Sequence, residues 1–283
     1  MHNSTFAQDI PVVAPGAVVK EISSQFKFTE GPAVNAQGDI YFTDQPNDKI
    51  WKYDASGHLS LFMDKTGRSN GLYFDKKGNI VACADEKDEL WSISPDKKVT
   101  VLLGDYEGKR LNGPNDLWID DKGGIYFTDP YYQRDYWDRT QPEIEEQKVY
   151  YLPPGAKAAV VADDKLVKPN GIVGTPDGKY LFVADIEDDK TYKYRINEDG
   201  SLTDRQLFVA QGSDGMTLDN EGNLYITGNG VTIYDKTGKK LGNIPIPRHW
   251  TGNICFGGKD RQTLFITASE AIYTLQMRVK GVE

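Results

Sequence analysis

Residues 37–44 read QGDIYFTD and residues 122–129 read KGGIYFTD, so one short phrase occurs twice in the chain. It consists of a polar turn containing glycine, followed by a run rich in β-branched and aromatic residues. A glycine turn before such a run is typical of a short β-strand. The same pattern recurs in weaker form at residues 77–82, 177–185, 221–227 and 260–267.

The spacing of these six copies indicates a repeat architecture. Their marker positions are 38, 78, 123, 178, 222 and 261, so the intervals are 40, 45, 55, 44 and 39 residues. Further strand-like stretches follow each copy, for example at residues 49–53 and 191–194. A period of about 40–45 residues with four short strands is typical of a propeller blade. The sequence therefore predicts an all-β fold, a six-bladed β-propeller.

The repeat also predicts the domain organisation. We expect a flexible N-terminal tail over residues 1–15 and a single propeller domain over residues 16–283. A strand at residues 16–22 would pair with the last blade and close the ring, which removes a free sheet edge. The 55-residue interval indicates an insertion, for which residues 131–147 are the candidate. We expect this insertion to overhang the mouth of the central channel and to influence substrate choice.

Composition excludes several partners. The 283 residues carry 33 Lys and Arg against 42 Asp and Glu, a net charge of −9, which argues against a nucleic-acid partner. No apolar run approaches the roughly 18 residues of a membrane span, so no membrane partner is expected. The two cysteines, Cys83 and Cys255, are too few for a disulfide framework or a zinc cluster. The oligomeric state is not indicated.

The first nine residues leave the cellular location open. They lack the apolar segment of a signal peptide. If they are the remnant of a clipped signal peptide, the protein is periplasmic or secreted; otherwise it is cytoplasmic.

One oxygen-bearing side chain occurs at the same position in every repeat, eight residues before the marker. Equal position in each repeat means equal height around the propeller axis, so these side chains should converge on the mouth of the central channel. Ca²⁺ takes about 6–8 oxygen ligands, and the absence of neighbouring Cys and His argues against zinc as the preferred ion. The pattern predicts a central metal site. The six residues are Glu30, Asn70, Asn115, Asn170, Asp214 and Asn253.

A structural alternative applies to part of this set. Asn is a favoured turn residue, and repeats copy their turns, so Asn70 and Asn253 have a purely local explanation. Glu30 is not a turn former, and a carboxylate facing a packed channel is costly without a counter-charge. The metal site is therefore the better interpretation of the set as a whole.

Five short motifs carry a family resemblance: FTEGP at 28–32, NGPND at 112–116, YFTDP at 126–130, PNG at 169–171 and SDGM at 213–216. Together they resemble the senescence marker protein/gluconolactonase (regucalcin-like) family, in particular its bacterial gluconolactonase branch. The resemblance covers nearly the whole chain. It implies a metal-dependent hydrolase that opens a sugar (aldono) lactone, with a small-molecule lactone as its substrate.

The resemblance also implies roles for individual residues. Glu30, Asn170 and Asp214 would bind one divalent cation, with Asn115 contacting both metal and substrate. Ca²⁺ is the expected ion, with Mg²⁺, Mn²⁺ or Zn²⁺ as alternatives. The cation would polarise the lactone carbonyl, while Asp214 would remove a proton from the attacking water; Glu30 is the rival for that role.

The chain departs from the regucalcin-like pattern at two positions. Gly113 stands where those members carry an Arg, and Gln133 stands near the place of a Glu. Both family residues contact the sugar lactone, so the preferred lactone is open here. The substitutes expected to bind substrate on the same rim are Arg110, Asn112, Tyr131 and Gln133.

Two other functions remain open at this point. An organophosphate hydrolase of the diisopropyl-fluorophosphatase type shares the six-bladed fold and a Ca²⁺ site made of one Glu, two Asn and one Asp. A non-catalytic propeller that only binds a ligand is the second alternative, because fold does not determine function.

Overall fold

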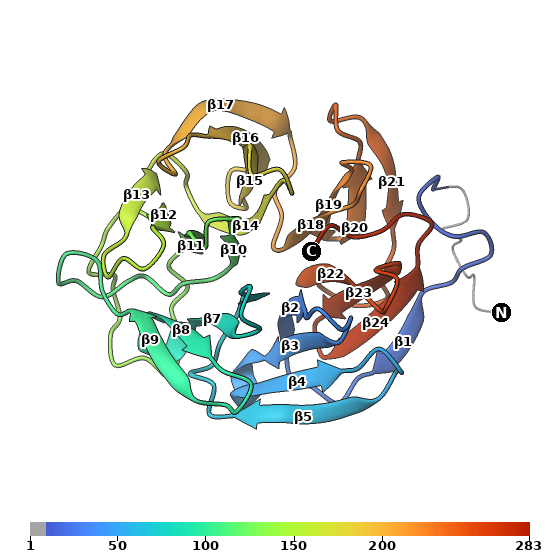
Figure 1. Cartoon of the computed structure of the whole chain (residues 1–283), viewed down its shortest axis with the longest axis horizontal. Coiled ribbons are helices and arrows are strands. Elements are labelled where there is room, and N and C mark those ends of the chain that lie inside the picture. The colour runs from blue at the N-terminus through green and yellow to red at the C-terminus, as the bar shows by residue number, and fades with distance from the viewer. Residues whose placement is uncertain (1–9) are drawn as a thin grey trace.

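Six four-stranded antiparallel sheets form a ring in the computed structural model, which describes residues 10–283 (Figure 1). The predicted six-bladed β-propeller is confirmed. Blade 1 contains β2 (Thr29–Val34), β3 (Ile40–Asp44), β4 (Lys49–Tyr53) and β5 (Leu59–Asp64). Blade 2 contains β6 (Leu72–Phe74), β7 (Ile80–Ala84), β8 (Glu89–Ile93) and β9 (Val99–Leu103). Blade 3 contains β10 (Leu117–Ile119), β11 (Ile125–Asp129), β12 (Lys148–Leu152) and β13 (Val160–Asp163).

The second half of the ring repeats this plan. Blade 4 contains β14 (Pro169–Gly174), β15 (Tyr180–Asp185), β16 (Lys190–Ile196) and β17 (Leu202–Val209). Blade 5 contains β18 (Met216–Leu218), β19 (Leu224–Gly228), β20 (Gly230–Tyr234) and β21 (Lys240–Ile244). Blade 6 contains β22 (Asn253–Gly257), β23 (Thr263–Ala268), β24 (Ala271–Gln276) and, from the other end of the chain, β1 (Lys20–Ser23).

The recurring sequence phrase is the tight turn between the first and second strands of a blade. In blade 2, Asp75 Oδ1 accepts hydrogen bonds from the backbone N–H groups of Lys77 and Asn79, both at 2.8 Å. Gly78 has a φ of +82°, a conformation that side chains disfavour. In five blades an Asp, Asn or Thr at the first turn position and a Gly at the fourth explain the polar turn that marks the repeat. In blade 6 these two positions are Gly258 and Arg261.

The ring is closed by pairing the first strand of the chain with the last. β1 pairs antiparallel with β24, with Lys20 opposite Thr274, so the outermost strand of blade 6 comes from the N-terminal end. This is the closure expected from the sequence, which placed the strand at residues 16–22. Because each end of the chain supplies part of one sheet, the ring opens only if that sheet comes apart.

The N-terminal boundary differs from the one expected. Residues 1–9 of the expected tail lie outside the described residues. Within the remainder, Ile10, Val12 and Val13 are buried against blades 5 and 6. A β-bridge between Val13 and Met277 adds to this packing. The packed part of the chain thus begins at least six residues before residue 16, because three aliphatic side chains there have an apolar surface to cover.

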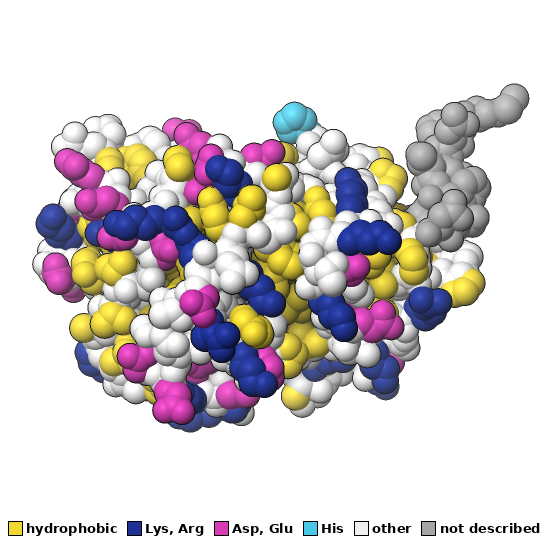
Figure 2. Space-filling model, turned by 90° about the horizontal axis from the view of Figure 1, so that it is seen from above, with side chains coloured by type: hydrophobic (Ala, Val, Ile, Leu, Met, Phe, Trp, Pro, Cys, Tyr) yellow, Lys and Arg dark blue, Asp and Glu magenta, His cyan; other side chains and the backbone are white. Residues whose placement is uncertain are grey.

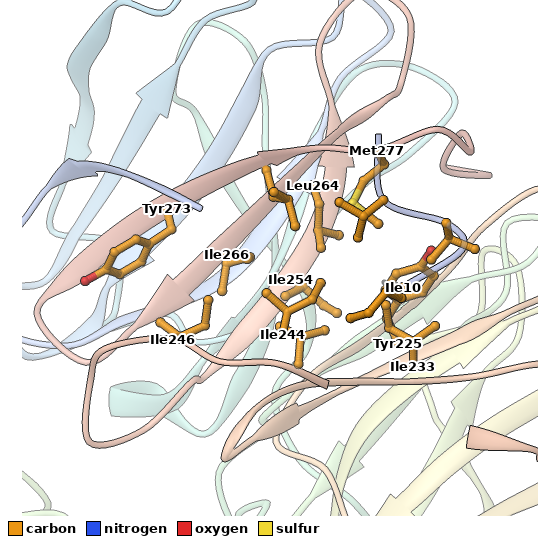
Figure 3. Packing of buried hydrophobic residues seen from close by; sticks show 14 of the residues in the cluster. Ile10, Tyr225, Ile233, Ile244, Ile246, Ile254, Leu264, Ile266, Tyr273 and Met277 are labelled. Atoms are coloured by element: carbon orange, nitrogen blue, oxygen red, sulfur yellow. The ribbon is translucent and has the colours of Figure 1, made fainter. Parts of the chain in front are cut away.

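The hydrophobic core lies between neighbouring blades rather than in one central cluster. In the cluster of Figure 3, Ile233 and Ile244 of blade 5 lie against Ile254 and Ile266 of blade 6. Burying an aliphatic side chain of this size stabilises the fold by about 1.5–3 kcal/mol. The centre of the ring is therefore left to polar side chains.

The cysteines, the surface charges and the helices show no further special feature among the described residues. Cys83 in blade 2 and Cys255 in blade 6 are buried and free. On the side of the ring shown in Figure 2, basic and acidic side chains are interspersed. Among residues 10–283, no helix has the length and apolar character needed to cross a membrane.

Replacing Phe256 by Ala should destabilise the protein by about 3–5 kcal/mol, because the side chain is large and its loss leaves a cavity. Phe256 is fully buried and its ring meets that of Tyr225 edge-on at 5.3 Å across the interface of blades 5 and 6. Urea unfolding measures the change. Leu207→Ala is the control, since Leu207 is 54% exposed and should change stability by no more than about 0.5 kcal/mol. Similar losses in both variants would contradict the interblade core.

Candidate functional site

A cavity of about 370 Å³ lies at the mouth of the channel, where the inner strands begin. Five of the six repeated oxygen-bearing side chains line it, one from each of blades 1 to 5. These are Glu30, Asn70, Asn115, Asn170 and Asp214. The rest of the lining is supplied by Phe28, Gln45, Pro46, Tyr132, Arg134, Ile186 and Trp250. The equal-height expectation thus holds for five blades.

The sixth member, Asn253, lies outside this lining. Its Nδ2 donates a hydrogen bond to Asp116 Oδ2 at 3.2 Å, and its Oδ1 accepts one from the Ile254 N–H at 2.8 Å. Asn253 belongs to blade 6 and Asp116 immediately precedes the inner strand of blade 3, so this bond joins opposite sides of the ring. The Asn253 side chain also lowers the pKa of Glu30, so it lies at the axis beside the cavity lining. A turn-forming role does not explain this Asn.

The glycines after these amides have a packing role. A Cβ on Gly71 would lie 2.6 Å from the Asn115 carbonyl oxygen, and one on Gly171 would lie 2.6 Å from that of Asp214. Inner strands of neighbouring blades therefore approach backbone to backbone, and the Gly71 N–H donates to the Asn115 carbonyl at 2.7 Å. Each Asn–Gly pair serves two purposes: the glycine permits close approach, and the Asn projects into the centre.

The two carboxylates of the cavity influence each other's pKa: Asp214 raises that of Glu30, whereas the Glu30 side chain lowers that of Asp214. Burial raises the pKa of Glu30 well above its usual range, and the Asp214 carboxylate raises it further. Burial also raises the pKa of Asp214, to about 6, although hydrogen bonds from Trp250 and Asn170 lower it in part. Two acids placed this way favour a positive charge between them.

The donor set fits a hard divalent cation. The Asn170 side chain is 1% exposed, and its Oδ1 is buried without a hydrogen-bond partner, while its Nδ2 donates to Tyr132 Oη at 3.1 Å. A buried carbonyl oxygen left unpaired is costly, and metal coordination would relieve that cost. No group of three or more His, Cys, Asp or Glu side chains gathers within residues 10–283, so a cation here would rely on amide oxygens as well.

Trp250 was missed by the sequence analysis. It lies in the loop before β22, and its Nε1 donates to Asp214 Oδ2 at 2.6 Å. The available signal was an aromatic residue just before the last inner strand, next to His249, which is exposed. Nothing in the sequence pairs this Trp with an acid 36 residues away.

Two of the expected substrate-binding residues differ from the observed ones by a single position. Tyr132 and Arg134 line the cavity, whereas Tyr131 and Gln133 do not. Tyr131 hydrogen-bonds Gln133, and Gln133 Nε2 donates to the Arg139 carbonyl at 2.8 Å. The alternate pair, Tyr132 and Arg134, thus faces the cavity.

The other two expected residues hold the base of the insertion. Arg110 is exposed, and its Nε and Nη1 contact Glu143 and Asp138, each at 2.7 Å. Asn112 is fully buried, and its Nδ2 donates to the Glu146 carbonyl at 3.3 Å. Both residues lie outside the cavity lining. Of the expected substrate-binding set, only Asn115 faces the cavity.

A second cavity, of about 400 Å³, lies between blades 2 and 3 at their turns. Its buried acid is Asp120, which accepts hydrogen bonds from the backbone N–H groups of Lys122 and Gly124 and from Tyr151 Oη. Its ion pair, Lys76 with Asp121, is exposed to solvent. These polar groups are satisfied locally, so the central cavity is the better candidate site.

The pattern of the SMP-30/Gluconolactonase/LRE-like region matches residues 28–270, nearly the whole propeller. The chain belongs to this family. Within the SMP-30/gluconolactonase family, it is 29% identical to a gluconolactonase of Zymomonas mobilis over an alignment covering 93% of this chain and 82% of that protein.

Solved structures agree with this assignment. A gluconolactonase from Xanthomonas campestris superposes with a TM-score of 0.87 and 29% identity, covering 96% of this chain and 93% of that one. A calcium-binding protein described as regucalcin, from Agrobacterium tumefaciens, superposes with a TM-score of 0.78 at 18% identity. It covers 94% of this chain and 95% of that one, and at this identity it shows the shared fold alone.

In this member of the family, the insertion between β11 and β12 is anchored on blade 2. Arg139 Nη2 pairs with Asp88 Oδ1 at 2.7 Å, and both side chains are at most 5% exposed. Trp137 Nε1 donates to the Asp85 carbonyl at 2.9 Å. These contacts hold the segment that brings Tyr132 and Arg134 to the cavity.

Arg139→Met should destabilise the protein more at pH 8 than at pH 5. Burial raises the pKa of Asp88 to about 7, and Arg139 lowers it in part, so removing Arg139 raises it further. The unfolded chain ionises this group near pH 3.9, so the folded state loses stability as the pH rises through the folded pKa. Since one pKa unit corresponds to about 1.4 kcal/mol, the loss at pH 8 should exceed the loss at pH 5 by about 1 kcal/mol.

Urea unfolding at the two pH values measures the effect. Arg195→Met is the control, because Arg195 and Asp204 form a pair in which both side chains are more than half exposed. That variant should lose at most about 1 kcal/mol at either pH. An Arg139→Met loss that does not depend on pH would contradict the buried pair.

Proposed function

We propose that this protein is a metal-dependent hydrolase that opens a sugar (aldono) lactone, as a gluconolactonase does. The observation that carries the proposal is the convergence of Glu30, Asp214 and the unpaired Asn170 Oδ1 on one cavity. The relatives at 29% identity that are named gluconolactonases support the choice of a lactone as substrate.

Glu30, Asn170 and Asp214 would hold the cation, with Asn115 as a further ligand that also contacts substrate. Oxygen donors of this kind suit Ca²⁺, and they also accept Mg²⁺, Mn²⁺ or Zn²⁺. When bound, a divalent cation polarises an ester carbonyl and stabilises the negative charge that develops on its oxygen.

Asp214 is the proposed general base. Trp250 holds Oδ2, which leaves Oδ1 to accept a proton from a water molecule that attacks the lactone carbonyl. A carboxylate within hydrogen-bond reach of the attacking water can act as the general base. Glu30 is the rival base, with Oε2 accepting a hydrogen bond from the Gly31 N–H at 3.0 Å.

Tyr132 is suited to orienting the substrate. Its hydroxyl oxygen accepts the hydrogen bond from Asn170, so its own proton is available to an oxygen of the ligand. Burial raises the pKa of Tyr132, which keeps the hydroxyl protonated at neutral pH.

Purified protein should hydrolyse at least one aldonolactone in a panel that also contains phosphotriesters, and chelation should abolish this activity. Ca²⁺, Mg²⁺, Mn²⁺ and Zn²⁺ should restore it to different degrees, because each meets the oxygen donors with its own preferred geometry. Full activity after metal has been removed, with elemental analysis to confirm the removal, would refute the metal requirement. Turnover of phosphotriesters alone would favour the organophosphate hydrolase, and binding without turnover would favour a non-catalytic propeller.

Two substitutions should separate the base from the metal ligands. Asp214→Asn keeps an oxygen donor but removes the base, so kcat at saturating metal should fall by about 10²–10⁴-fold. Asn170→Ala removes a neutral ligand, so metal affinity measured by calorimetry should fall, with activity partly recovered at high metal concentration. Asn70→Ala is the matched cavity control and should change both quantities little. Near-full kcat for Asp214→Asn at saturating metal would move the base to Glu30.

A further inference from the structure

Arg134 is the one Lys, Arg or His side chain that lines the central cavity in the part of the chain that the structure describes. It arrives on the insertion between β11 and β12, together with Tyr132. The other charged groups of the cavity are the carboxylates of Glu30 and Asp214, which are proposed to bind the cation. A single guanidinium therefore faces the space that remains for the substrate.

Only the Nε side of the Arg134 guanidinium is hydrogen-bonded to the described part of the protein. Arg134 Nε donates to Asp85 Oδ2 at 3.1 Å, and Tyr136 Oη donates to the same oxygen. Among the hydrogen bonds of residues 10–283, no other guanidinium atom of Arg134 donates to the protein. A guanidinium has five N–H donors in a planar fork that matches carboxylate and phosphate oxygens. The donors on the terminal nitrogens are thus available to a ligand.

A second cation, Lys168, contacts the same tyrosine but does not line the cavity. Lys168 Nζ lies 4.9 Å from the centre of the Tyr132 ring, and the Arg134 guanidinium lies 5.5 Å from the same ring. Lys168 is paired with Glu187 at 2.7 Å and does not line the cavity. Two cations therefore contact one tyrosine, but only Arg134 is directed to the site.

We infer that Arg134 recognises an anionic substituent on the substrate, a carboxylate or a phosphate outside the lactone ring. This inference rests on the proposed function and narrows its substrate class to acidic sugar lactones. Asp85 acts as a positioning residue that fixes the Nε side, so the terminal nitrogens can bind two oxygens of the anion. Hydrogen bonds between charged groups are the stronger ones, so this contact should contribute to selectivity.

The kinetic test compares three forms of one lactone: gluconolactone with its terminal hydroxyl free, phosphorylated or replaced by a carboxylate. The wild type should prefer an anionic form, and the phosphate and carboxylate arms show which one. In Arg134→Gln, the ratio of kcat/KM for that form over the neutral form should fall by about 10–100-fold, mainly through KM. Arg134→Lys should restore part of the ratio. Lys168→Gln is the matched control and should leave the ratio unchanged.

An equal loss on neutral and anionic lactones in Arg134→Gln would overturn the inference, because Arg134 would then act on the acid pair or on the metal. A wild type that prefers the neutral lactone would overturn it as well. Thermal unfolding of each variant shows that the fold is intact. If Arg134→Gln does not fold, the same comparison is made with Arg134→Lys, for which a partial loss of the ratio is expected.

Direct binding separates this inference from the proposed function. Calorimetry with sorbitol and with its terminal phosphate, neither of which contains a lactone, should show tighter binding of the phosphate by the wild type. This difference should shrink by about 10-fold or more in Arg134→Gln. If no lactone is turned over but this difference persists, the proposed function fails and anion recognition stands. If the difference does not depend on Arg134, anion recognition fails whatever the activity.

Discussion

The convergence of six inner strands on one axis is the constraint on which the rest of the structure depends. It brings backbones so close that a Cβ on Gly71 or Gly171 would lie 2.6 Å from a carbonyl oxygen of the next blade. The side chains of the residues that precede these glycines, Asn70 and Asn170, therefore point into the central cavity. The same requirement that packs the ring therefore lines its mouth with oxygen-bearing side chains.

This arrangement buries several carboxyl groups near the axis of the ring, where their ionisation is unfavourable. The apolar side chains are used between blades, so the polar groups meet in a confined space. Burial raises the pKa of Glu30, Asp214 and Asp116, the last to about 8. The Asp116–Asn253 contact satisfies one of these acids across the channel, whereas Glu30 and Asp214 line the cavity. An acid pair and an unpaired amide oxygen at one place are the natural setting for a cation.

The insertion after β11 gives the otherwise regular ring its individual features. Its contacts with Asp85 and Asp88 fix it to the neighbouring blade, so the residues it carries are placed by tertiary contacts rather than by the repeat. Tyr132 and Arg134 reach the cavity in this way. The insertion thus adds two cavity side chains that the repeat does not supply.

The repeat in the sequence by itself determined the number of blades, the closing strand and the five cavity side chains from Glu30 to Asp214, since equal phase means equal height. Only the tertiary structure showed that Tyr132 and Arg134, rather than Tyr131 and Gln133, line the cavity. An irregular loop has no sequence period that predicts which of its side chains face the cavity. Asn253 also reaches the axis, but its bond to Asp116 joins residues 137 positions apart on opposite sides of the ring, which the repeat does not show. Trp250 could not be assigned at all: its contact with Asp214 exists only once blades 5 and 6 are packed side by side.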